Sequence, residues 1–138
     1  MGVGTVNVLD THALVWRLAD PDTLPRKARA RIDRAVTDGE PLRASSISAW
    51  EVAMLVARGR LTLTMDVGAW IAAAESLPQL EFVPVDNAIA LRAVALPEAF
   101  GRDPADRIIV ATALGLGATL VTGDRRLRGH PPLRTLWQ

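Results

Sequence analysis

The sequence predicts an α/β fold in which helices cover both faces of a mostly parallel central β-sheet. Three observations lead to this prediction. Short apolar runs, typical of buried strands, alternate along the chain with longer segments of helical periodicity. The stretch over 101–124 reads as a helix that turns directly into a buried strand. The chain has 138 residues, 49% of them hydrophobic, which suits the core of a single domain spanning 1–138.

Five short runs have the composition of strands. Aliphatic and β-branched residues fill most of them, and turn-forming residues such as Asp, Gly and Pro bound them. The expected strands span 5–9, 42–44, 80–84, 118–122 and 133–136. Because helical segments separate most of these runs, the strands are expected to pair in parallel.

Six segments are expected to be helical, because each carries apolar residues on one side of a helix and ends near Gly, Pro or Asp. They span 11–19, 25–37, 45–57, 65–77, 86–95 and 104–116. The last helix has the clearest start. Asp103 is a good N-cap, and Pro104 suits the first helical position.

Composition excludes several classes of protein. The formal net charge of +1 argues against disorder and against a wholly basic protein that coats nucleic acid. There is no cysteine, so disulfides and thiol chemistry are excluded. Lys27 is the only lysine, and arginine therefore supplies nearly all the positive charge. Arginine suits phosphate binding, although genomic base composition explains the bias equally simply.

The sequence indicates no export signal and no membrane contact. The first ten residues lack the basic region and the apolar core of a signal peptide. No apolar run approaches the roughly 20 residues that a membrane span requires. We therefore expect a cytoplasmic protein.

Four acids lie where the elements of an α/β fold meet. Asp10 and Asp124 follow predicted strands, whereas Glu51 and Asp106 enter predicted helices. The carboxyl ends of parallel strands and the amino ends of the following helices share one edge of the sheet, where ligands bind. Four carboxylates at that edge would repel one another unless a cation intervened. Mg²⁺ or Mn²⁺ prefers such oxygen ligands, and either ion supports hydrolysis of a phosphodiester.

Each acid also has a purely structural interpretation. Asp10 and Asp124 could cap the helical turns that follow them, and Asp106 could complement a helix dipole. Ser48-x-x-Glu51 has the form of a capping box. Only the convergence of all four acids favours a functional site over capping.

Five short motifs carry a resemblance to a known family. They are VLDTHALVW at 8–16, SxxSxWEVA at 45–53, GRL at 59–61, DPxDR at 103–107 and LVTxD at 120–124. In this order and at this spacing they resemble the PIN-domain family, and within it the VapC toxins of bacterial toxin–antitoxin pairs. The resemblance covers nearly the whole chain, from about position 7 to position 124.

The resemblance implies an endoribonuclease that depends on Mg²⁺ or Mn²⁺ and cleaves RNA. It also implies a cognate VapB-type antitoxin that occupies the active-site groove, and a homodimer. By position, Asp10 and Asp106 match direct metal ligands. Glu51 and Asp124 complete the acidic quartet, through water or at a second ion.

Further residues beside the quartet are candidates for supporting roles. Thr11 and Thr122 could support the site through their hydroxyl groups, and Asp103 is either part of the site or only a helix cap. Basic residues beside the acids could contact the RNA backbone, although a solvated turn or, for the first of them, a structural ion pair explains them as well. These residues are Arg107, Arg125, Arg126 and Arg128.

Three tryptophans and His12 are expected to have structural roles. Trp16, Trp50 and Trp70 lie at helical spacing among apolar residues, which favours core or dimer contacts over stacking on bases. His12 could face the site, but a packing role is the simpler interpretation.

Two other functions remain compatible with these residues, and a third is disfavoured. The chain could be a non-catalytic PIN-like module that binds protein or RNA, with the acids serving as caps. It could be a nuclease acting on DNA, since nothing identifies a contact to a 2′-hydroxyl. A phospho-receiver domain would need a lysine after a late strand, and Lys27 lies in an early helix.

Overall fold

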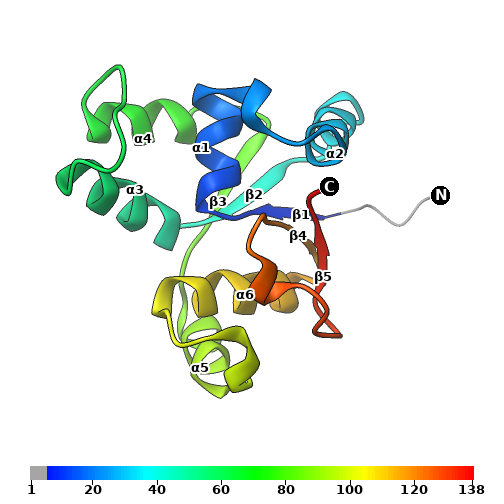
Figure 1. The fold of residues 1–138 in the computed structure, drawn as a ribbon. Helices are drawn as coiled ribbons and strands as arrows, with labels where there is room; N and C mark the ends of the chain where they lie inside the picture. The colour runs from blue at the N-terminus through cyan, green and yellow to red at the C-terminus, as the bar shows by residue number, and fades with distance from the viewer. Residues whose placement is uncertain (1–5) are drawn as a thin grey trace.

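A five-stranded parallel sheet forms the centre of the computed structural model, which describes residues 6–138 (Figure 1). The spatial order of the strands is β3-β2-β1-β4-β5, and every neighbouring pair runs in parallel. The strands are β1 (Asn7–Leu9), β2 (Leu42–Ser45), β3 (Leu80–Val83), β4 (Thr119–Val121) and β5 (Arg134–Leu136). The predicted α/β fold with a mostly parallel sheet is confirmed.

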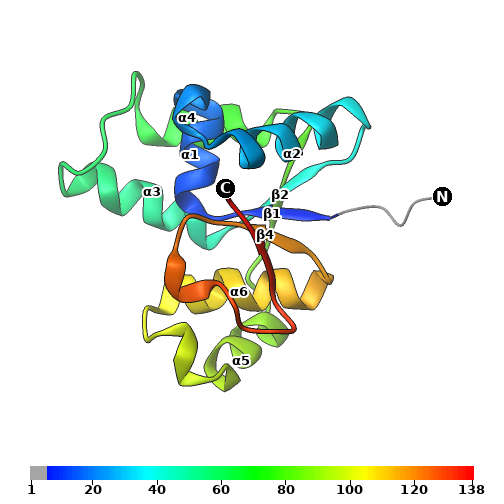
Figure 2. The same ribbon diagram turned by 45° about the vertical axis from the view of Figure 1, so that its right-hand side comes forward.

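Helices cover both faces of this sheet (Figures 1 and 2). They are α1 (Thr11–Ala19), α2 (Arg26–Thr37), α3 (Ile47–Ala57), α4 (Val67–Glu75), α5 (Asn87–Ala95) and α6 (Pro104–Leu116). Helices α1, α2 and α4 lie on one side, and α6 lies on the other with α5 packed behind it. Helix α3 contacts α1 and α4 as well as α6, so it bridges the two sides at one end of the sheet. Three 3₁₀ turns, Pro21–Thr23, Glu98–Phe100 and Arg125–Leu127, complete the described elements.

The predicted elements all occur, with small shifts at their ends. The expected strand over 5–9 is observed as β1, and its first position, Thr5, lies outside the described residues. The helix expected over 45–57 begins at Ile47, because Ser45 still pairs with Val83 in the sheet. The helix expected over 65–77 is shorter, because the carboxylate of Asp66 accepts from the Ala69 N–H and caps it at Val67.

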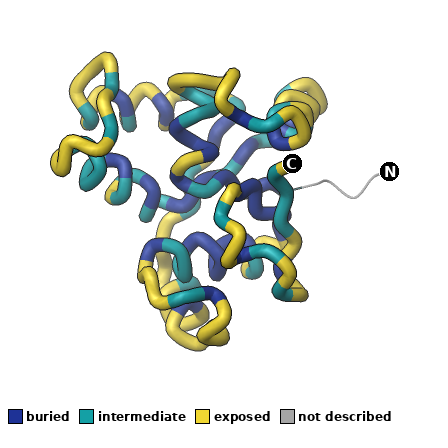
Figure 3. The backbone as a smooth tube through the Cα atoms, in the orientation of Figure 1, coloured by how far each residue is buried: buried dark blue, intermediate teal, exposed yellow. Residues whose placement is uncertain are grey.

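Alternating strand residues build two cores. Val8 and Leu120 point to the side covered by α6, whereas Leu9 and Val121 point to the side covered by α1 and α2. All four side chains are fully buried. Figure 3 shows the buried segments gathered along the central strands, with the exposed segments in outer turns and helices. The central strands β1 and β4 are therefore buried on both faces, as is typical of parallel sheets.

The expected structural roles of the tryptophans hold only in part. Trp70 is 7% exposed and belongs to the core on the α1 side. Trp50, in contrast, is 56% exposed on α3, so the core alternative is wrong for this residue. Within residues 6–138, no helix combines the length and the hydropathy needed to cross a membrane.

The strand order changes direction beside β1. The chain adds β2 and β3 on one side of β1 and then returns to add β4 and β5 on the other. At the carboxyl end, the Asp10 N–H donates to the Val121 carbonyl at 3.1 Å, so the chain leaves β1 and β4 at the same point. A reversal of this kind opens a crevice at the sheet edge, where ligands of α/β proteins bind.

Candidate acidic active site

A cavity of about 580 Å³ lies at this reversal point. Five acids from different parts of the chain line it, namely Asp10, Glu51, Asp103, Asp106 and Asp124. The structure thus brings the whole predicted quartet to one place. A second hollow of about 640 Å³ lies beside α5 and α6, and its lining is mostly apolar. Charge therefore singles out the first cavity as the candidate site.

Asp10 is both a helix cap and a wall of the cavity. Its Oδ1 atom accepts from the Ala13 N–H at 2.8 Å, which caps α1. The buried Thr122 hydroxyl bonds to the same carboxylate and also accepts from the Asp124 N–H at 3.1 Å. Burial raises the pKa of Asp10, against the effect of these hydrogen bonds. Thr122 therefore links the two acids that follow β1 and β4.

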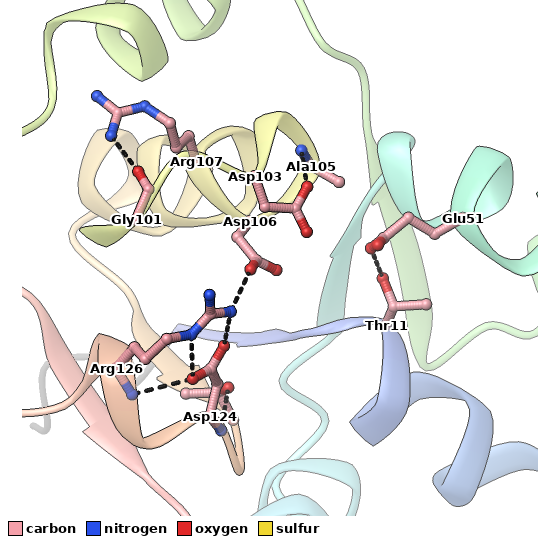
Figure 4. Close-up of polar contacts among 10 residues, drawn as sticks. Thr11, Glu51, Gly101, Asp103, Ala105, Asp106, Arg107, Asp124 and Arg126 are labelled. Atoms are coloured by element: carbon pink, nitrogen blue, oxygen red, sulfur yellow. Dashed lines mark hydrogen bonds and ion pairs between the residues drawn. The ribbon is translucent and has the colours of Figure 1, made fainter. Parts of the chain in front are cut away.

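Glu51 is held by side chains from α1 and α3. The Thr11 hydroxyl donates to its Oε1 atom in a short hydrogen bond (Figure 4). Ser48 Oγ lies 2.9 Å from Thr11 Oγ1. The capping-box interpretation of Ser48 and Glu51 is wrong, because α3 begins at Ile47 and the residue before it makes no side-chain cap. Burial raises the pKa of Glu51, although the bond from Thr11 lowers it in part. Ser48, which the sequence marked only as a possible cap, is buried and supports Thr11, the residue that bonds to Glu51.

Asp103 and Asp106 both line the cavity, but only Asp103 also caps α6. Asp103 Oδ1 accepts from the Ala105 N–H at 3.0 Å, so its expected capping role is confirmed. Asp106, in the first turn of α6, makes no cap and points toward Arg126 (Figure 4). Burial raises the pKa of Asp106 to about 6, and repulsion from neighbouring carboxylates, Asp103 first, adds to this effect.

Arg126 lies between Asp106 and Asp124. Its Nη2 atom is 2.9 Å from Asp106 Oδ2 and 2.6 Å from Asp124 Oδ2, while Nε donates to Asp124 Oδ1 at 3.1 Å. Asp124 also caps the following 3₁₀ turn through the Arg126 N–H. The hydrogen bonds from Arg126 lower the pKa of Asp124. Among the acids of the cavity, Asp124 has a lowered pKa, because the guanidinium of Arg126 donates to both of its carboxylate oxygens.

The donor set suits a hard divalent cation. Every acidic ligand in the cavity is a carboxylate, and three of these groups have raised pKa values, which a nearby cation would relieve. Across residues 6–138, His, Asp and Glu side chains nowhere form a ready-made coordination shell of three or more ligands. A cation that bound Asp106 and Asp124 would replace the guanidinium of Arg126, and it would keep several water ligands, as Mg²⁺ does.

Arg107 has a structural role that differs from the expected ion pair. Its side chain donates to five backbone carbonyls in the end of α5 and in the connection from α5 to α6. They belong to Ala93, Val94, Leu96, Pro97 and Gly101. A guanidinium has five N–H donors, so none is left for phosphate or for an acid. The expected ion pair of Arg107 is therefore wrong, because the residue fastens the α5–α6 connection instead. A contact of Arg107 with RNA stays a prediction, and it would require some of these hydrogen bonds to break.

We expect Arg107→Lys to destabilise the fold by about 1–3 kcal/mol, because an ammonium cannot satisfy five carbonyls arranged around a planar fork. Urea denaturation at neutral pH measures the effect. Arg102→Lys, at an exposed neighbouring position, is the matched control and should leave the unfolding midpoint unchanged. Equal midpoints for the two variants would contradict this role of Arg107.

The other candidate arginines for RNA binding lie in the turn after β4, at Arg125, Arg126 and Arg128. Arg125 is exposed, whereas Arg128 is partly buried and donates to the Gly123 carbonyl at 3.4 Å. The structure brings only Arg126 of this group into the acidic cavity. Any contact of Arg125 or Arg128 with RNA stays a prediction.

The pattern of the PIN domain matches residues 8–131 of this sequence. The chain belongs to the PIN-domain family. This finding confirms the resemblance on which the acidic quartet was assigned.

A relative places this PIN domain among VapC-type proteins, and two solved structures share its fold. Ribonuclease VapC22 from Mycobacterium tuberculosis is 38% identical over 135 residues, which cover 96% of this chain and 99% of the relative. The crystal structure of VapBC2 from Rickettsia felis, bound to a promoter DNA fragment, matches with a TM-score of 0.70 at 17% identity over 97% of this chain and 100% of that chain. DNA-bound VapBC from Salmonella typhimurium matches with a TM-score of 0.66 at 19% identity, over 96% and 97% of the two chains. These two structures share the fold.

The cavity of this PIN domain is also lined by His12, as one of its two sequence interpretations allowed, and by residues that the sequence did not mark as functional. His12 lies in the lining and is exposed, so its expected packing role accounts only for its edge contact with Trp16. Trp16, Gly123 and Trp137 complete the wall next to it. Trp137 stands at the far end of the chain from Trp16, and no local pattern links the two.

Proposed function

We propose that this chain is a metal-dependent endoribonuclease toxin and that positions 1–138 act as one PIN-like domain. The observation that carries the proposal is the convergence of the acidic quartet on one cavity at the reversal point of the sheet. The similarity to a relative named as a VapC ribonuclease supports RNA as the substrate. PIN-domain ribonucleases of the VapC type depend on a metal ion, and the donors here favour Mg²⁺ or Mn²⁺.

In the proposed mechanism, Asp10 and Asp106 would hold the divalent cation, and the neighbouring Asp124 would assist them. When bound, this cation supplies positive charge for the phosphate oxygens and lowers the pKa of water. Glu51, oriented by Thr11, accepts the proton of the attacking water. The water oxygen then bonds to phosphorus as the bond to the 3′-oxygen breaks. The leaving 3′-oxygen takes up a proton from solvent, so the products are a 3′-hydroxyl and a 5′-phosphate.

Cleavage of end-labelled RNA tests this proposal. We expect discrete fragments with Mg²⁺ or Mn²⁺, none with EDTA, and at least a 1,000-fold loss of rate for Asp10→Asn. Thermal melting of both proteins provides the control for folding. A 2′,3′-cyclic phosphate on the products would contradict the mechanism. A folded protein that neither binds Mn²⁺ nor cuts RNA would instead favour the non-catalytic binding module.

Thr11 offers a finer test of how Glu51 is positioned. We expect Thr11→Val to lower kcat about tenfold, because it removes the hydroxyl that holds Glu51 without changing the shape of the side chain. The pH at which activity appears should also rise, since the Thr11 hydrogen bond lowers the pKa of Glu51. Thr11→Ser, which keeps the hydroxyl, is the control. An unchanged pH profile in Thr11→Val would contradict this role.

We further propose a VapB-type antitoxin as partner and a homodimer as the assembled state, both acting in the cytoplasm where the RNA is found. The similarity to chains from VapBC complexes supports the first of these. Growth arrest on expression, relieved by co-expression of a VapB-type antitoxin, tests for this partner. Light scattering of the purified chain tests for the dimer.

A further inference from the structure

One wall of the acidic cavity is aromatic. Trp137, which follows β5, and Trp16, on α1, both line the cavity together with His12. The two indole rings lie 5.7 Å apart between centroids, at an angle of 37°, and His12 meets Trp16 edge to face at 6.0 Å. Three aromatic side chains thus form a continuous row beside the carboxylates. Most of the remaining lining is acidic, so the cavity presents two different chemistries to one ligand.

Trp137 is fixed directly beside Asp124. Its carbonyl accepts from the Ala28 N–H at 3.1 Å, and the Leu136 carbonyl before it accepts from the Thr122 N–H at 3.2 Å. A Cβ atom at Gly123 would lie 2.8 Å from Cε2 of the indole, closer than van der Waals contact allows. The ring therefore packs against the backbone of Gly123, one residue before the acid. Only glycine at this position permits that approach.

Core packing alone does not account for this arrangement. Trp16 and Trp137 pack against the buried core on the α1 side, yet both remain only partly buried and face the cavity as well. A buried aliphatic residue would fill a core at this place without an aromatic surface at the cavity wall. Aromatic side chains beside a nuclease site provide surfaces on which the bases of single-stranded nucleic acid stack.

We propose that Trp137, supported by Trp16, is a stacking platform for the nucleobase next to the scissile phosphate of RNA. This inference rests on the proposed ribonuclease function and adds how the substrate is held. The two walls match the two parts of a nucleotide. The phosphate reaches the acids through the divalent cation, while the base of the same or the adjoining nucleotide lies on the aromatic row. A flat aromatic group and an anion so close together are typical of a nucleotide.

Cleavage of short single-stranded oligoribonucleotides, intact or abasic at one position near the cut, tests the platform. We expect Trp137→Ala to lower kcat/KM for the intact oligonucleotide about tenfold, mainly through KM, and Trp137→Phe to restore most of it. The abasic oligonucleotide at the stacked position should be cut by the parent protein and by Trp137→Ala at the same reduced efficiency. Gly123→Ala, which displaces the ring, should behave like Trp137→Ala. Trp50→Ala, at an exposed tryptophan outside the cavity, should have no effect.

Binding provides a second measurement that does not depend on turnover. In the Asp10→Asn background, the intact oligonucleotide should quench the fluorescence of Trp137 more than the abasic one does. Thermal melting of each variant identifies any loss of fold.

Three results would overturn the platform while leaving the ribonuclease in place. In the first, an active enzyme cuts intact and abasic oligonucleotides equally well. In the second, Trp137→Ala loses activity equally on both and melts at a lower temperature, which is a purely structural role. In the third, Trp137→Ala weakens only the binding of an antitoxin peptide, which makes the wall a protein contact. Failure of the ribonuclease itself is distinct, because no RNA would then be cut by any variant.

Discussion

Replacement of Asp106 by asparagine is expected to abolish RNA cleavage and at the same time to stabilise the folded protein. The rate should fall at least 1,000-fold, because the variant removes a proposed direct ligand of the catalytic cation. The gain in stability has a separate cause. The pKa of Asp106 in the folded chain is about 6, well above the ordinary aspartate value of 3.8, so ionising this carboxyl opposes folding.

The sign of the pH dependence follows from these two values. Below about pH 4 the carboxyl is protonated in both the folded and the unfolded chain, and the variant should have no advantage. As the pH rises toward about 6, the unfolded chain has lost the proton while the folded chain still holds it, so the stability of the parent protein falls. Above that pH the variant should be more stable by up to about 3 kcal/mol, since a tenfold change in proton affinity corresponds to about 1.4 kcal/mol.

Urea denaturation between pH 4 and pH 8 without added metal measures this difference. Asp103→Asn is the matched control, because it changes a neighbouring carboxylate that caps α6. Asparagine is also a good cap, so this control should stay within about 1 kcal/mol of the parent protein. A destabilised Asp106→Asn variant at pH 8 would show that the bond to Arg126 outweighs burial and repulsion.

Arg126→Ala is expected to bind Mn²⁺ about ten- to a hundredfold more tightly than the parent protein. The guanidinium contacts Asp106 at 2.9 Å and Asp124 at 2.6 Å, where it competes with a divalent cation for the same oxygens. Opposite charges at such distances attract each other, and the exposure of Arg126 weakens this attraction through solvent screening. Removing the competing charge therefore returns part of that energy to metal binding.

Calorimetric titration with Mn²⁺ at pH 7 measures this affinity. Arg125→Ala is the matched control, because it removes the same charge from an exposed position next in the chain. Its affinity for Mn²⁺ should differ little from that of the parent protein. If both variants bind Mn²⁺ equally well, the cation binds away from Asp106 and Asp124, and the competition is refuted. The same pair of variants shows whether Arg126, once released from the acids, contributes to RNA binding.

The parallel sheet, its helices and the convergence of the acids at one edge of the sheet were all predictable from the sequence. In a parallel sheet, every strand ends at the same edge, so an acid placed directly after a buried strand has only one region in which to lie. Asp10 and Asp124 were predictable for this reason, because the apolar runs before them are unmistakable. The PIN-domain motifs added Glu51 and Asp106 to the predicted site by their positions in the sequence. The family match confirms the PIN-domain resemblance that these motifs carry.

Tertiary structure alone decided how those acids are held. Ser48-x-x-Glu51 satisfies a local capping pattern, but the hydroxyl that binds Glu51 comes from Thr11, 40 residues away. Arg107 lies next to an acid in the sequence, yet the α5–α6 turn offers five carbonyls that satisfy it completely. Trp137 and Trp16 meet only because β5 joins the sheet beside β4. Contacts between distant segments depend on packing and register, and local sequence patterns carry no information about either.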